Sequence, residues 1–335
     1  MMRFRFKPIP QKDFRPMTLS SLTRRALLAT GLALAAGFAS PARAADKLTV
    51  MLEWFVNPDH APLVVAEKLG LFKEAGLEVT MVPPSDPSAV PRLVAAGQAD
   101  IGIHYQPNLY LDHAAGIPIV RVGTLVETPL NSVIVKADGP IKSLADLKGK
   151  TIGYAVSGTE TTLLGQMLAK AGLKLDDVKL VNVNFALSAA LIGGKVDATL
   201  GGYRNFELTQ MKLEGHPGTA FYPEEHGVPA YDELILITRR ESVGDSRLPR
   251  FLDAIEKAAL YLTNHPQEAW KLFIAAHPDL DDALNRQAWI DTLPRFAKRP
   301  RALDQGRYER FGAFLVERGL IQKAPALAEI ASEVK

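Results

Sequence analysis

The chain has 335 residues, of which 47% are apolar and 23% are charged. This composition predicts a water-soluble globular protein, long enough to build one large or two moderate hydrophobic cores. It contains no cysteine, which excludes disulfides, thiol nucleophiles, zinc–thiolate sites and a lipid-bearing cysteine at a mature N-terminus.

The first 44 residues have the layout of a secretory signal peptide. Their basic start leads into an apolar run over 26–39 and a small-residue end at 42–44. The run is too short to span a bilayer comfortably. We therefore expect cleavage near Ala44 and a mature protein in the periplasm. The pair Arg24 and Arg25 favours the twin-arginine export route, with general secretion as the alternative.

The leader also accounts for the basic character of the chain. The whole chain has a formal net charge of +2, and residues 1–44 hold eight Lys/Arg against one acid. Their net +7 leaves −5 for residues 45–335. A mildly acidic protein without a stripe of basic residues has no electrostatic basis for nucleic-acid binding.

Beyond the leader, short apolar runs alternate with segments of helical periodicity. Strands are predicted at 47–54, 77–83, 99–105, 117–126, 131–137, within 143–158, and at 178–184, 196–203 and 233–240. Helices are predicted at 60–76, 86–98, 107–116, 159–173 and 187–195, and the chain becomes all-helical from residue 242. This rhythm indicates parallel or mixed sheets with helices on their faces.

The rhythm starts twice, which predicts an α/β protein with two lobes, each a mixed sheet flanked by helices. We expect lobe one at 45–133 plus 234–335 and lobe two at 134–233. Crossings near 131–136 and 232–236 would form a two-stranded hinge. Ligands in open α/β sheets bind beyond the carboxyl ends of strands, so a cleft between two such lobes is the expected site.

Polar and aromatic residues follow the first and third predicted strands. Trp54, Asn57 and His60 follow the first, and Tyr105 and Gln106 follow the third. Trp54 offers a flat face for stacking, and Asn57 offers both a donor and an acceptor. The alternative is structural, with a turn at 57–59, a helix cap and a core tryptophan.

Two later stretches follow strands in the same way. At 157–160, Ser157, Gly158, Thr159 and Glu160 would place backbone N–H groups at a helix start, where a carbonyl or anionic group could bind; an ordinary helix cap is the alternative. Tyr203 and Glu207 are four residues apart, which predicts one shared helix face. A glutamate facing a cleft would accept hydrogen bonds from ligand amino groups, whereas a surface glutamate would not.

The sequence offers little for catalysis. It has no Gly-x-Ser-x-Gly, no His-Glu-x-x-His and no phosphate-binding loop, and its seven histidines lack metal-ligand spacing. We therefore expect no catalytic residues, no metal and no cofactor.

Four stretches resemble a known family, the periplasmic substrate-binding proteins of ABC importers for the pyrimidine precursors of thiamine. They are LEWFVNPDHAPLVVAEKLGLFKEAGLEV, RLVAAGQADIGIHYQPNLYL, PIKSLADLKGKTIGYAVSG and VDATLGGYRNFELTQMKLEG. The resemblance implies the two-lobed type II periplasmic binding fold and no enzymatic activity. It also implies a monomer that delivers an aminopyrimidine to an inner-membrane ABC permease with its ATPase.

The resemblance also implies roles for individual residues. Trp54 and Tyr203 would line or stack on the heterocycle, Asn57 and His60 would border the pocket, and Glu207 would take the amino groups. Two alternatives stay open. The cargo could be a sulfonate, nitrate or riboflavin, or the chain could be an exported enzyme acting on a pyrimidine, since a fungal pyrimidine-building enzyme shares the superfamily.

Overall fold

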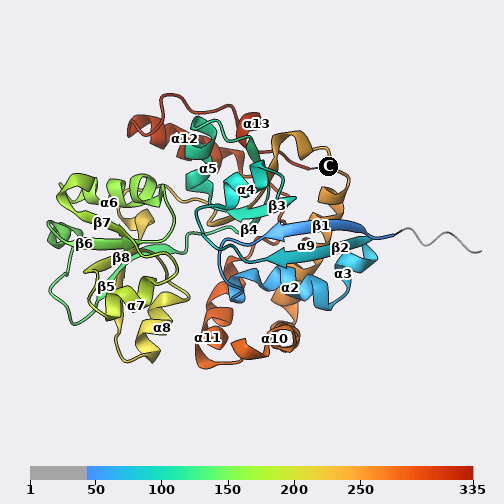
Figure 1. Ribbon diagram of the computed structural model, residues 1–335, viewed down its shortest axis with the longest axis horizontal. Coiled ribbons are helices and arrows are strands. Elements are labelled where there is room, and N and C mark those ends of the chain that lie inside the picture. The colour runs from blue at the N-terminus through green and yellow to red at the C-terminus, as the bar shows by residue number, and fades with distance from the viewer. Residues whose placement is uncertain (1–43, 335) are drawn as a thin grey trace, which may run out of the picture. The chain divides into compact units, whose positions relative to one another are not determined.

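The computed structural model describes residues 44–334, and residues 45–335 form one compact unit. The expected signal peptide lies outside the described residues, apart from Ala44. Within the compact unit, the backbone builds two five-stranded sheets with helices on their faces (Figure 1).

Both sheets are mixed, which confirms the predicted α/β class. The first has the order β2-β1-β3-β10-β4, and the second has the order β7-β6-β8-β5-β9. In the first sheet only β10 runs antiparallel to its neighbours, and in the second β5 does so. The strands are β1 (Asp46–Met51), β2 (Leu77–Val82), β3 (Ile101–His104), β4 (Ile119–Val126), β5 (Asn131–Lys136), β6 (Thr151–Tyr154), β7 (Lys179–Asn182), β8 (Ala198–Tyr203), β9 (Gly218–Phe221) and β10 (Leu234–Arg239).

The helices largely follow the predicted periodicity. They are α2 (Ala61–Lys68), α3 (Leu71–Glu74), α4 (Val90–Ala95), α5 (Gln106–Ala114), α6 (Gly165–Lys170), α7 (Leu187–Ile192), α8 (Glu207–Leu213), α9 (Arg247–Asn264), α10 (Pro266–Ala276), α11 (Ala283–Thr292), α12 (Gln305–Glu317) and α13 (Leu327–Ile330). The single helix expected over 60–76 is divided, because Gly70 has a φ of 74° between α2 and α3. The helix expected over 159–173 opens with a π-helical turn, Glu160–Leu164.

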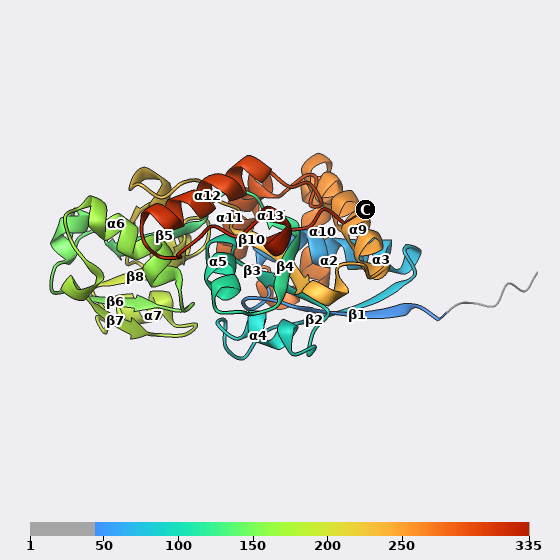
Figure 2. The same cartoon turned by 90° about the horizontal axis from the view of Figure 1, so that it is seen from above.

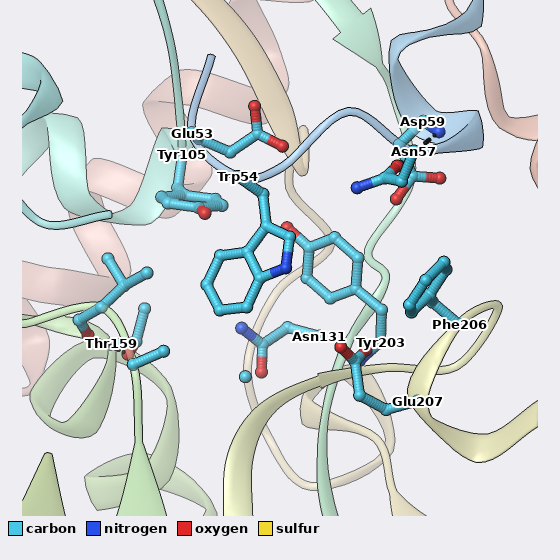
Figure 3. A pocket seen from close by; sticks show the side chains of 13 residues that line it. Glu53, Trp54, Asn57, Asp59, Tyr105, Asn131, Thr159, Tyr203, Phe206 and Glu207 are labelled. Carbon is cyan, nitrogen blue, oxygen red and sulfur yellow. Dashed lines mark hydrogen bonds between the residues drawn. The ribbon is translucent and has the colours of Figure 1, made fainter. Parts of the chain in front are cut away.

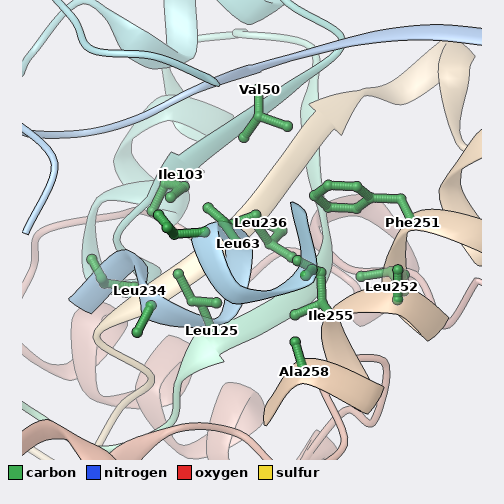
Figure 4. Packing of buried hydrophobic residues seen from close by; sticks show 14 of the residues in the cluster. Val50, Leu63, Ile103, Leu125, Leu234, Leu236, Phe251, Leu252, Ile255 and Ala258 are labelled. Atoms are coloured by element: carbon green, nitrogen blue, oxygen red, sulfur yellow. The ribbon is translucent and has the colours of Figure 1, made fainter. Parts of the chain in front are cut away.

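Strands that are buried on both faces hold the hydrophobic core together. In β10, Leu234 and Leu236 join the cluster formed with α2 and α9, whereas Ile235 and Ile237 join the cluster on the opposite face. This follows from the two-residue period of a strand. Figure 4 shows Leu234 and Leu236 among Leu63, Ile255 and other buried apolar side chains.

The chain passes between the two sheets twice, at 127–130 and at 222–233. The crossings expected near 131–136 and 232–236 begin a few residues earlier than predicted, since residues 131–136 already form β5 of the second sheet and β10 of the first sheet begins at residue 234. Glu233 links the two crossings: its carboxylate accepts the backbone N–H groups of Leu130 (2.6 Å) and Asn131 (2.9 Å). Both views of the ribbon place β5, β6 and β8 with α6 and α7 on one side and β1 to β3 on the other (Figures 1 and 2).

Candidate ligand-binding site

Strand ends from both sheets surround one cavity. Residues just beyond β1, β3 and β6, together with the end of β8 and the start of β5, form its wall. A concave site at strand ends, lined by aromatic side chains and a few polar groups, is typical of small-molecule binding. The cavity is lined by Glu53, Trp54, Asn57, Asp59, Tyr105, Asn131, Ala155, Val156, Thr159, Gly201, Tyr203, Phe206 and Glu207 (Figure 3).

Four aromatic side chains line this cavity: Trp54, Tyr105, Tyr203 and Phe206. Figure 3 shows the rings of Trp54, Tyr105 and Tyr203 close to one another. Trp54 also packs edge-on against Phe185, which precedes α7, with ring centroids 4.6 Å apart. Such a set of rings can stack on a flat heterocycle.

Three carboxyl groups, from Glu53, Asp59 and Glu207, face the same space, and no Lys, Arg or His is among the lining residues. Carboxylates accept hydrogen bonds and repel anions. The cavity is therefore suited to a ligand rich in N–H donors that is neutral or positively charged.

The Glu53 carboxylate is held from behind by His60, which is fully buried and does not line the cavity. His60 Nδ1 accepts the backbone N–H of Asn57 (3.2 Å), so Nε2 carries the ring proton. Nε2 lies 3.1 Å and 3.0 Å from the two Glu53 oxygens and donates to them. His60 thus orients a cavity carboxylate and is too deep to contact a ligand directly.

Asp59 forms hydrogen bonds that link a segment beside the first sheet to a segment that follows a strand of the second sheet. Its Oδ1 accepts from Asn205 Nδ2 (2.7 Å) and from the Thr292 hydroxyl (2.8 Å), and Asn205 Nδ2 lies 2.7 Å from that hydroxyl. Burial raises the pKa of Asp59 to about 6, against the lowering effect of the Thr292 hydrogen bond. Asp59 and Thr292 belong to elements beside the first sheet, whereas Asn205 follows β8 of the second, so the three side chains form a buried clasp.

Glu207 lines the cavity, but its backbone position differs from the one that its sequence spacing predicted. The shared helix face with Tyr203 is wrong, because Tyr203 ends β8 and Glu207 begins α8. The Glu207 carboxylate instead folds back and accepts the Tyr203 backbone N–H at 2.6 Å. Loss of solvent at the cavity wall raises the pKa of Glu207 to about 7, and the Tyr203 hydrogen bond lowers it in part.

The two asparagines that line the cavity differ in whether their side-chain polar atoms already have hydrogen-bond partners. Asn57 is occupied locally, since its side chain accepts from the Asp59 backbone (2.8 Å) and donates to the Phe55 carbonyl (3.1 Å). Asn131 is 3% exposed and its Oδ1 has no hydrogen-bond partner. A buried polar atom without a partner is costly, which marks Asn131 as a group available to a ligand.

The loop after β6 contributes less than expected. Only Thr159 of the four predicted residues at 157–160 lines the cavity. Ser157 bonds across to the first-sheet side instead, through its carbonyl to Asn108 Nδ2 (2.8 Å) and its N–H to Ser88 Oγ (3.1 Å). Gly158 has a φ of 96° and its N–H donates to the Glu160 carboxylate (2.8 Å), so these two residues shape the loop.

Gln106 lies at the second crossing and does not line the cavity. Its Oε1 accepts the Asp232 backbone N–H at 2.7 Å, one residue before Glu233. Burial raises the pKa of Glu233 to about 7, and the backbone donors Asn131 and Leu130 lower it in part.

Six of the eleven residues predicted from sequence line the cavity, namely Trp54, Asn57, Tyr105, Thr159, Tyr203 and Glu207. His60, Gln106, Ser157, Gly158 and Glu160 lie behind or beside it. The sequence did not predict the other seven lining residues, which are Glu53, Asp59, Asn131, Ala155, Val156, Gly201 and Phe206. Glu53 carried a signal, because an acid directly after a buried strand is unusual unless it has a function or a partner.

Within residues 44–334, no group of three or more His, Cys, Asp or Glu side chains is arranged to hold a metal ion. In the same part of the chain, no helix has both the length and the apolar character needed to cross a bilayer.

Comparison with solved structures identifies the fold as that of the periplasmic binding proteins. A Candida albicans protein described as having the generic periplasmic binding protein fold matches with a TM-score of 0.67 and 17% identity, over 86% of this chain and 97% of that one. The alkanesulfonate-binding protein of Xanthomonas axonopodis pv. citri, bound to MOPS, matches with a TM-score of 0.65 and 19% identity, over 86% and 96% of the two chains. At these identities the likeness concerns the fold alone.

The chain belongs to the NMT1/THI5-like family, whose model matches residues 57–269. A Haemophilus influenzae protein named as a thiamine biosynthesis protein is 50% identical, over 88% of this chain and 94% of that one. The formylaminopyrimidine-binding protein of Halalkalibacterium halodurans is 36% identical, over 76% and 78%. A 4-amino-5-hydroxymethyl-2-methylpyrimidine phosphate synthase of Legionella pneumophila is 27% identical, over 79% and 86%, so the family includes both binding proteins and synthases.

Proposed function

We propose that this protein is the substrate-binding component of an ABC importer and captures an aminopyrimidine precursor of thiamine in the cavity between its two sheets. The ligand would be of the formylaminopyrimidine or hydroxymethylpyrimidine type. The observation that carries the proposal is the lining itself: four aromatic rings and three carboxyl groups, with no cationic side chain.

This lining also separates the proposed cargo from the alternatives. Sulfonate and nitrate are anions, and a cavity with three carboxyl groups and no basic side chain would repel them. A flat ring with exocyclic and ring nitrogen atoms matches both the stacking surfaces and the acceptors. The relative named as a formylaminopyrimidine-binding protein supports the same choice.

A synthase is the second candidate, because a relative carries that name. Its named product bears a phosphate, and phosphate sites are normally built from Arg, Lys or helix N-termini. None of the lining side chains is basic. We therefore favour binding over catalysis.

The proposal includes export and a two-lobed organisation. Residues 1–44 would be removed as a signal peptide, and the mature protein would act as a periplasmic monomer that docks on a permease with its ATPase. Residues 45–133 plus 234–335 would form one lobe and residues 134–233 the other, with ligand-induced closure between them.

Calorimetric titration of the mature protein tests the proposal. We expect saturable binding of 4-amino-5-hydroxymethyl-2-methylpyrimidine or its formylamino relative, with no heat from an alkanesulfonate or nitrate. Product analysis after long incubation should show the pyrimidine unchanged. Binding of the anions in preference to the pyrimidine, or conversion of the pyrimidine, would refute the assignment.

A further inference from the structure

The three carboxyl groups of the cavity are not equivalent. Both Glu53 oxygens receive the His60 ring N–H, and Asp59 Oδ1 receives Asn205 and Thr292. Glu207 has only main-chain donors: Tyr203 N–H bonds to Oε2, and no side chain among residues 44–334 donates to Glu207. Glu207 is therefore the one of the three that no side chain engages, and its Oε1 is open to a ligand, as is Asp59 Oδ2.

The charges around Glu207 disfavour its ionised form. Asp59 is the charged neighbour that acts on it, and it repels the carboxylate. Among the elements packed against α8, α7 and β9 carry no titratable side chain. In α11, Arg286 is paired with Asp281, and Asp291 accepts from Gln287 Nε2 (3.0 Å). The other titratable groups at the cavity are Glu53 with His60 behind it, Tyr105 and Tyr203.

The chemistry of an aminopyrimidine then creates a mismatch. The amino group is a donor, but the ring nitrogen beside it is an acceptor, and an ionised carboxylate has only acceptors. One carboxylate oxygen can pair with the amino group, while the other faces a lone pair. One added proton between this oxygen and the ring nitrogen turns the repulsive contact into a second hydrogen bond.

A second observation points to a ligand at this place. Asn131 Oδ1 is buried in the same cavity wall without a partner, and Figure 3 shows the Asn131 side chain close to Trp54. This amide can take a further ligand N–H while the ring stacks on the aromatic side chains.

Resting on the proposed function, we propose that the site binds its aminopyrimidine together with one proton, shared between the Glu207 carboxylate and the ring nitrogen next to the amino group. No covalent bond of the ligand forms or breaks. The proton comes from solvent and returns to it on release, and the ligand is held as an amidinium–carboxylate pair or its neutral tautomer. The raised pKa of Glu207, about 7, is consistent with a carboxyl group that gains a proton easily.

The test is calorimetric titration of 4-amino-5-hydroxymethyl-2-methylpyrimidine at pH 8.5 in two buffers of different ionisation enthalpy. At that pH the free carboxyl is ionised, so wild-type protein should take up about one proton per ligand. Its affinity should fall by about tenfold per pH unit above pH 7.5, as linkage of one proton requires. Uptake of no proton, together with an affinity independent of pH, would overturn the proposal while leaving the proposed function intact.

Variants locate the proton. Glu207→Gln supplies an amide N–H to the ring nitrogen and a carbonyl to the amino group, the pairing that glutamine makes with adenine. It should bind without proton uptake and with an affinity that does not change from pH 7.5 to 9. Asp59→Asn should keep the uptake, as should Glu53→Gln. Uptake that persists in Glu207→Gln would overturn the assignment to Glu207, and failure of the pyrimidine to bind at any pH would overturn both proposals.

Discussion

The Asp59–Asn205–Thr292 clasp offers a direct test of closure, because it joins the two sheet segments without depending on ligand chemistry. Asn205 is 1% exposed, and its Nδ2 donates to both Asp59 Oδ1 and Thr292 Oγ1 at 2.7 Å. The change Asn205→Ala removes both hydrogen bonds. If the two lobes separate in the free protein, water can hydrogen-bond to all three side chains in the open form. The substitution therefore destabilises the closed form relative to the open form.

The magnitude follows from the two contacts. A hydrogen bond to a charged group contributes about 1.5–3 kcal/mol, and one between neutral groups about 0.5–1.5 kcal/mol. The closed form should therefore lose at least about 2 kcal/mol. Since about 1.4 kcal/mol corresponds to a factor of ten, a ligand that requires closure should bind at least about thirtyfold more weakly to Asn205→Ala.

Calorimetric titration with an aminopyrimidine measures this loss, and small-angle scattering at saturating ligand checks that the variant still closes. Asn264→Ala is a matched control, because Asn264 is exposed at the end of α9 and takes no part in the hydrogen bonds of the clasp. An unchanged affinity in Asn205→Ala would show that the clasp does not stabilise the ligand-bound form. An equal loss in Asn264→Ala would show that the effect is not specific to the clasp.

Three further perturbations follow from the cavity. Trp54→Ala should weaken binding of the pyrimidine by about tenfold or more through lost stacking, measured by calorimetry, and should leave the melting temperature of the free protein nearly unchanged. The raised pKa values of Glu207 and Glu233, about 7 each, mean that the folded state binds protons more tightly than the unfolded state, so the stability of the free protein should fall as pH rises from about 4.5 through 7. Urea unfolding across that range should show the decline, and Glu233→Gln should flatten it; a stability that rises with pH would contradict this sign. His60→Ala should leave the Glu53 carboxylate buried without its donor and lower the unfolding free energy by about 3 kcal/mol, whereas a loss below about 1 kcal/mol would show that the pair is not a stabilising unit.

Local sequence was enough to determine the fold class and much of the site. The run from Leu234 to Ile237 predicts a strand, because leucine and β-branched isoleucine follow one another without a polar residue. Residues placed at the end of a strand, such as Trp54 and Tyr105, could be assigned to the cavity because parallel strands end at a common edge. The missed strand β9 has only four residues, too few for a pattern of its own, and the helix expected to carry both Tyr203 and Glu207 begins only at Glu207.

The tertiary structure alone decided which polar groups face the ligand. His60 and Glu53 are seven residues apart, and nothing in their spacing says that the histidine lies behind and the glutamate in front. Asn205 meets Asp59 and Thr292 across 146 and 87 residues of sequence, a contact that no local pattern encodes. Sequence pattern reports which residues a strand or helix can present at its end. The orientation of each side chain depends on the hydrogen-bond donors and acceptors that distant segments of the chain place beside it. The way the two sheets pack together determines which segments those are.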